Sequence, residues 1–155
     1  MIQNNLPRIN LTNGMFTVSL DCELFWGVRD HRTLTGYGEN IRNVHRVVPR
    51  LLELFRRYDV HATWAVVGFL FFEDQSSLLK NIPQEKPSYA NSRFDQYNYI
   101  LQEELDPLYH FAPNLIKQIA ATPNQEIATH TFSHYYCLER GQTAGQFKVD
   151  IEHAL

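Results

Sequence analysis

Three short apolar segments, each followed by a pattern of helical spacing, constrain the fold of this chain most strongly. The apolar segments lie at residues 15–20, 61–67 and 125–129. Apolar residues recur at helical spacing in the stretches of about 41–58, 113–121 and 143–155. The stretch 72–111 is polar and rich in aromatic residues, and we expect short helices and loops there. Alternating strands and helices predict an α/β fold, in which parallel strands are joined by right-handed crossovers.

The connection after the first segment contains several turn-forming residues. Gly27, Gly36 and Gly38 predict a loop. Asn40 is a residue type that caps helices, and we expect the helix over residues 41–58 to begin after it.

The ends of two apolar segments carry the residues of chemical interest. The first segment leads into Asp21 and Glu23, and the third leads into His130 and His134. Functional sites of parallel α/β sheets form at the carboxyl ends of the strands, so these four side chains are expected to meet. Two carboxylates and two imidazoles are the inventory of a hydrolytic metal site with a general base beside it.

The spacing within each pair supports this interpretation. His130 and His134 are four residues apart, and on a helical turn such residues lie on one face and can bind one ion. In an extended strand Asp21 and Glu23 face the same side, whereas Cys22 faces the sheet. An ion held by two imidazoles and one carboxylate keeps a position open for water and lowers the pKa of that water toward about 7.

The bulk properties exclude several classes of function. A hydrophobic fraction of 44% and a charged fraction of 20% over 155 residues are typical of one globular domain. The net charge of −3 argues against nucleic acid as a partner. No apolar run approaches the roughly 20 residues of a membrane span. Residues 1–7 lack the features of a secretion signal, so we expect a cytoplasmic protein.

Three blocks of this chain resemble the polysaccharide deacetylases, which form carbohydrate esterase family 4 and share a homology domain with a rhizobial chitooligosaccharide deacetylase. Residues 19–23 (Ser-Leu-Asp-Cys-Glu) are similar to the first motif, a strand ending in two acids. Residues 62–68 (Ala-Thr-Trp-Ala-Val-Val-Gly) are similar to the second strand of the family. Residues 126–134 (Glu-Ile-Ala-Thr-His-Thr-Phe-Ser-His) match the third block, which is the most specific of the three.

The resemblance implies an irregular (β/α) barrel, of which this chain holds only the N-terminal βα units. We expect residues 1–155 to be the first half of one such domain, with no second domain. The later motifs of the family, one of which supplies a histidine as general acid, do not occur here. We therefore expect the general acid beyond Leu155, and little or no activity from this chain alone. The alternative to a missing half that completes the barrel is a partner chain that covers the free edge of the three-stranded sheet. A second copy of this chain, in a homo-oligomer, is one such partner.

The resemblance also implies roles for the motif residues. We expect Asp21 to be the general base and Glu23, His130 and His134 to be metal ligands. Family members commonly carry two adjacent acids, whereas here Cys22 separates them. The reverse assignment of the two acids and ligation of the metal by Cys22 therefore stay open. The expected cofactor is a divalent metal, zinc first, with cobalt or nickel as alternatives.

The loop after the first strand is expected to lie at the rim of the site. Its candidates for binding a sugar are Trp26, Arg29, His31 and Tyr37, with packing inside the loop as the alternative.

The expected function is hydrolysis of a non-peptide carbon–nitrogen bond, with removal of N-acetyl groups from an amino-sugar glycan or its precursor. Hydrolysis of a cyclic amide, as in allantoinases of the same fold, is one alternative. A non-catalytic module that binds a glycan is the other.

Overall fold

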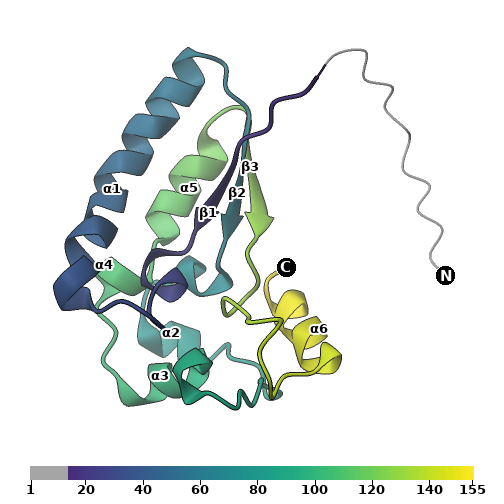
Figure 1. The fold of residues 1–155 in the computed structure, drawn as a ribbon. Helices are drawn as coiled ribbons and strands as arrows, with labels where there is room; N and C mark the ends of the chain where they lie inside the picture. The colour runs from purple at the N-terminus through teal and green to yellow at the C-terminus, as the bar shows by residue number, and fades with distance from the viewer. Residues whose placement is uncertain (1–13) are drawn as a thin grey trace, which may run out of the picture.

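The computed structural model describes residues 14–155, in which three parallel strands form one sheet in the order β1-β2-β3 (Figure 1). The strands are β1 (Ser19–Cys22), β2 (Ala62–Val66) and β3 (Gln125–Thr129). The expected α/β class and parallel strand direction are confirmed. The sheet of the described residues is open, with β1 and β3 at its edges, and does not form a barrel. The expectation about residues 1–7 lies outside the described residues.

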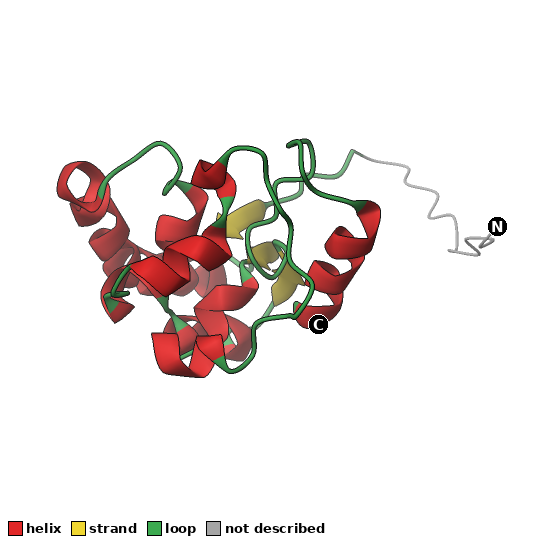
Figure 2. Cartoon of the chain, turned by 90° about the horizontal axis from the view of Figure 1, so that it is seen from below, coloured by secondary structure: helices red, strands yellow, loops and turns green. Residues whose placement is uncertain are grey.

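The helices are distributed around this sheet. On one side lie α1 (Leu34–Arg57) and α5 (Pro113–Ala121), which pack against each other (Figure 1). At the carboxyl ends of the strands the chain forms short elements, namely η1 (Leu24–Gly27), η2 (Gly68–Phe71), α2 (Gln75–Leu79), η3 (Ser92–Phe94), α3 (Gln96–Gln102) and α4 (Pro107–His110). The last helix, α6 (Ala144–His153), lies away from α1 and α5 (Figure 1). Seen from below, the chain ends beside a helix, at the mark C (Figure 2).

The first helix begins earlier than the sequence suggests. We expected Asn40 to cap it, but the cap is Thr33, whose side chain accepts a hydrogen bond from the backbone N–H of Gly36 at 3.2 Å. Gly36 and Gly38, expected in a loop, therefore lie in α1. Gly38 is buried beneath the ring of Tyr109, so packing against that ring offsets its low helix propensity.

The first strand is shorter than expected. It begins at Ser19, whereas Met15 and Phe16, which we placed in it, are 63% and 91% exposed. Parallel pairing sets the register, with Asp21 opposite Ala65 and Ala65 opposite Ala128. The carboxyl ends of β1, β2 and β3 therefore lie side by side.

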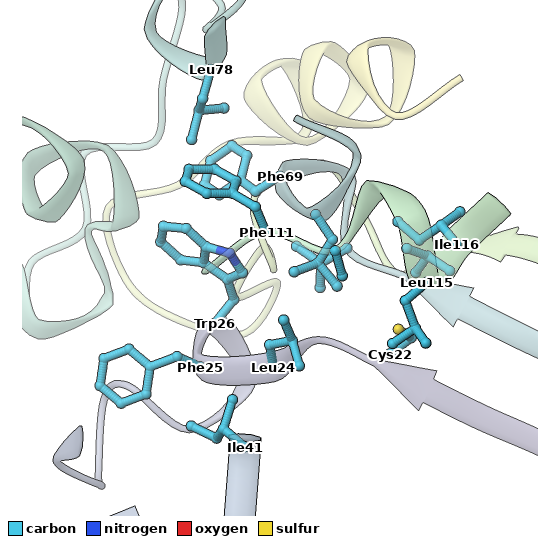
Figure 3. Packing of buried hydrophobic residues seen from close by; sticks show 14 of the residues in the cluster. Cys22, Leu24, Phe25, Trp26, Ile41, Phe69, Leu78, Phe111, Leu115 and Ile116 are labelled. Atoms are coloured by element: carbon cyan, nitrogen blue, oxygen red, sulfur yellow. The ribbon is translucent and has the colours of Figure 1, made fainter. Parts of the chain in front are cut away.

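A buried aromatic cluster lies beneath these strand ends (Figure 3). Trp26 is completely buried, and its indole N–H donates to the backbone carbonyl of His110 at 2.8 Å. Phe69 packs edge-on against Trp26 and against Phe132, with ring centroids 5.0 Å apart in each pair. Because these residues come from η1, η2 and the segment after β3, the cluster joins the three strand ends.

Among residues 14–155, no helix combines the length and the apolar character that a membrane crossing requires.

Replacement of Phe69 by alanine should lower the free energy of unfolding by about 3–5 kcal/mol, because it leaves a cavity among rings that cannot close around it. Leu138→Ala is the matched control, because Leu138 is fully exposed and its change should stay within about 0.5 kcal/mol. Urea denaturation followed by circular dichroism measures both. Equal effects would show that Phe69 is not part of a well-packed core.

Candidate metal centre

Glu23 stands at the point where the chain leaves β1. Its backbone, with φ −138° and ψ −14°, is no longer extended, and Leu24 adopts a left-handed conformation with φ 47°. The backbone N–H of Trp26 then donates to the carbonyl of Glu23 at 3.1 Å. The strand therefore ends at Cys22, and the Glu23 side chain does not continue the alternation of side chains along β1.

The two histidines come from the segment that follows β3. The backbone N–H of His130 donates to the carbonyl of Val66 at 2.9 Å, which continues the pairing of β3 with β2. We expected a helical turn from His130 to His134, and this is wrong, because Thr131 and His134 have φ values of 65° and 55°. The carbonyl of Thr131 accepts instead from the backbone N–H of Gly68 at 2.9 Å. Bonds to η2 therefore replace the bonds of a helix.

Asp150 of α6 holds the middle of this segment. Its side chain is 1% exposed and accepts from the backbone N–H of Phe132 at 2.7 Å and from the hydroxyl of Ser133. Burial raises the pKa of this carboxyl above its ordinary value. No local pattern singles out Asp150, because its partners lie 17 and 18 residues earlier in the chain.

Three side chains converge at the strand ends. One carboxylate oxygen of Glu23, Oε2, lies 3.2 Å from Nε2 of His130 and 3.1 Å from Nε2 of His134. One donor atom from each of the three residues lies within 4.8 Å of the others. Ligands about 2.1 Å from one ion are about 3.0 Å apart at right angles and about 3.4 Å apart at tetrahedral angles. The spacing and the donor types therefore fit a group that can hold a divalent metal.

Asp21 lies beside this group but on another side of His130. Its Oδ1 is 3.9 Å from Nδ1 of His130, whereas Glu23 faces Nε2 of the same ring. The Asp21 side chain is 60% exposed, and that of Glu23 is 27% exposed. The structure thus brings all four expected residues together and gives the two carboxylates different surroundings.

Electrostatic coupling within the group is strong. Hydrogen bonds from His130 and His134 lower the pKa of Glu23 to about 2. The hydrogen bond with Glu23 raises the pKa of His130 above its ordinary value. Glu23 is therefore held as an anion across the whole neutral range.

Cys22 has no place in this group. Its side chain is 5% exposed and lies among core residues that include Leu115 and Ile116 (Figure 3). Burial raises the pKa of its thiol to about 11. The open alternative of ligation by Cys22 is wrong for this structure, because the strand alternation directs the thiol into the core.

The four residues expected at the rim differ in their surroundings. Trp26 does not offer a surface to a sugar, because it is completely buried in the aromatic cluster. Tyr37 lies on α1 and, together with Asp21 and Glu23, lines a cavity of about 190 Å³. Its binding of substrate stays a prediction.

Arg29 is held by the protein itself, and His31 is exposed. The Arg29 side chain donates to the Gln96 side chain and to the carbonyl of Arg93, each at 2.5 Å. The ring of His31 is 53% exposed, and its Nδ1 lies 2.7 Å from a carboxylate oxygen of Asp30. Asp30 therefore orients this imidazole, and its role toward substrate stays a prediction.

A comparison with protein families supplies independent information about this chain. The family model described as polysaccharide deacetylase matches residues 36–154, which is more than half of the chain and includes both histidines. No curated protein and no solved structure matches.

The interaction between Glu23 and His130 predicts how the free energy of unfolding of the metal-free chain depends on pH. The stabilisation from His130, whose pKa is raised on folding, is complete below its ordinary value of 6.5 and is lost as pH rises through the raised value. The stabilisation from Glu23 is present above its ordinary value of 4.5 and is lost as pH falls toward about 2. Glu23→Gln should therefore destabilise the metal-free chain most between pH 4.5 and 6.5.

Chemical denaturation in the presence of a chelator, repeated across this pH range, measures the effect. Glu104→Gln, at an exposed position, is the control and should show no such window. A destabilisation by Glu23→Gln that is the same at every pH would show that the coupling is absent.

Proposed function

Because this chain belongs to the polysaccharide deacetylase family, we propose that it is a metal-dependent hydrolase that removes N-acetyl groups from an amino-sugar glycan or its precursor. The observation that carries the proposal is the convergence of Glu23, His130 and His134 within 4.8 Å. A module that only binds a glycan does not need such a set of metal-binding side chains.

The three side chains are the proposed ligands of a divalent metal. Two imidazole nitrogens and one carboxylate oxygen suit zinc, with cobalt and nickel as alternatives, and leave a coordination position open. The bound ion would polarise the acetyl carbonyl and make water a better nucleophile at neutral pH. Glu23 contributes as an anion between two imidazoles, which is the protonation state that a ligand requires.

Asp21 is the proposed general base. A base must be able to gain a proton near neutral pH, and Glu23, with a pKa of about 2, is poorly suited to that task. Asp21 is more exposed, accepts no hydrogen bond from the two histidines, and stands next to His130. Its carboxylate can therefore take a proton from a water molecule that approaches the acetyl carbonyl.

A second role for Asp21 follows from the same geometry. Histidine ligands commonly donate their second ring N–H to a carboxylate, which fixes the tautomer and the ring orientation. Asp21 faces Nδ1 of His130, and a small movement would shorten the 3.9 Å separation to a hydrogen bond. Asp21 would then orient the ligand, and the two roles differ in their effect on metal affinity.

Alanine at His130 or at His134 should lower zinc affinity by more than about 100-fold while the chain stays folded, because each variant removes a direct ligand. Isothermal titration with zinc measures the affinity, and circular dichroism verifies the fold. His61→Ala, at an exposed position, is the control and should bind one equivalent like the unmodified chain. Full zinc occupancy in both alanine variants would mean that the ligands lie elsewhere.

Asp21→Asn should lower the zinc-dependent hydrolysis of 4-nitrophenyl acetate by about 10²–10⁴-fold, with zinc affinity unchanged. This ester has a leaving group that needs no proton, so its hydrolysis tests the base without a general acid. If Asp21 orients His130, zinc affinity falls instead by about 10–100-fold and turnover recovers at saturating zinc.

The substrate class is tested in parallel with N-acetylglucosamine oligomers and with allantoin. Because little amide hydrolysis is expected without the general acid, zinc-dependent hydrolysis of the ester, or slow release of acetate from the oligomers, that disappears in His130→Ala supports the proposal. Ring opening of allantoin would favour the cyclic-amide alternative. Zinc binding without hydrolysis of any of the three compounds, the ester included, would overturn the proposed activity.

A further inference from the structure

Gly27 lies directly beneath the carboxylate of Glu23. A Cβ atom built on Gly27 would overlap Cδ and both carboxylate oxygens of Glu23, and even the farthest of the three atoms is only 2.5 Å away. All three nearest atoms belong to this one side chain. No larger residue can occupy position 27 while the Glu23 side chain keeps its conformation.

The backbone does not explain why glycine stands here. Among the described glycines, only Gly141 has a positive φ, so the conformation of Gly27 is open to an ordinary residue. Space for the carboxylate is therefore the feature that requires glycine.

The turn itself cannot move aside to relieve the overlap. Leu24, Phe25 and Trp26, which precede Gly27 in η1, are 7%, 4% and 0% exposed. The backbone N–H of Val28 donates to the carbonyl of Phe25 at 3.1 Å, which closes the turn. Because the core holds this backbone, an added Cβ must displace the flexible Glu23 side chain instead.

We infer that Gly27 is a positioning residue whose missing side chain lets Glu23 reach both imidazoles at once. The inference deepens the proposed function and rests on the metal site proposed there. A methyl group on residue 27 would overlap the carboxylate in its present position, in which one oxygen lies 3.2 Å from His130 and 3.1 Å from His134. The carboxylate would therefore have to leave that position. A carboxylate displaced from this position no longer keeps its present geometry toward both histidines, so one of the three proposed ligands is disturbed.

Gly27→Ala should lower zinc affinity by about 10–100-fold and change the visible absorption spectrum of the Co²⁺-loaded chain, because the donor set changes. The control is Gly145→Ala in α6, where the nearest atom to an added Cβ is 3.8 Å away. This control should keep the affinity and the spectrum of the unmodified chain.

A double-mutant cycle shows whether Gly27 acts through Glu23. In a chain that already carries Glu23→Ala, the addition of Gly27→Ala should change zinc affinity less than about twofold, because no carboxylate is left to displace. If Gly27→Ala does not fold but the double variant does, the clash with Glu23 is demonstrated directly.

Four results would overturn the inference. Affinity in Gly27→Ala equal to that of the unmodified chain would remove the positioning role and leave the proposed function intact. An equal loss in both backgrounds, or misfolding of both variants, would show that glycine serves the backbone. No zinc binding by the unmodified chain would overturn the proposed metal site, and the inference with it.

Discussion

A single carboxylate, that of Glu23, faces two imidazoles that are brought to it from the opposite edge of the sheet. His134 lies 111 residues later in the chain. Parallel pairing makes the meeting possible, because Cys22 lies opposite Val66 and Val66 lies opposite Thr129. The last residues of β1, β2 and β3 therefore form one row, and the residue after each outer strand begins the site. A shift of one residue in either register would direct these side chains to the other face.

The segment that carries Glu23 and the segment that carries the histidines pack on the same core. After Glu23, Trp26 of η1 packs against Phe69. In the segment that carries the histidines, Phe132 stands between His130 and His134 and also packs against Phe69. Asp150 then holds the amide of Phe132 from α6. The polar groups of the site are consequently positioned by buried residues.

Periodicity predicted the parts of the fold that short-range patterns determine. The second strand was expected at residues 61–67, and β2 spans Ala62–Val66; the expected helix over 113–121 agrees with α5. The predicted start of α1 was wrong, because Thr33, which like Asn40 is a residue type that caps helices, forms the cap. Gly38, in the part of α1 that precedes Asn40, lies against the ring of Tyr109, a tertiary contact that a local pattern does not show.

The site shows the same division between local and tertiary signals. Motif spacing identified Asp21, Glu23, His130 and His134, which the structure brings together. Trp26 was misplaced at a rim because nothing local indicates that a tryptophan after a strand turns inward. The role of Asp150 and the role inferred for Gly27 could not be predicted, because each depends on a tertiary contact: with Phe132 and Ser133 for Asp150, and with the side chain of Glu23 for Gly27.

The single residue between the two acids has a physical consequence. In a regular strand Asp21 and Glu23 would point the same way and repel each other as like charges. Here the strand ends after Cys22, and the non-extended backbone of Glu23 turns its carboxylate toward Nε2 of His130, whereas Asp21 stays near Nδ1. The two carboxyl groups thus face different nitrogens of one imidazole ring. Glu23 is held by two imidazoles and has a pKa of about 2, whereas Asp21 is more exposed to water, which is the asymmetry that separate roles as ligand and base require.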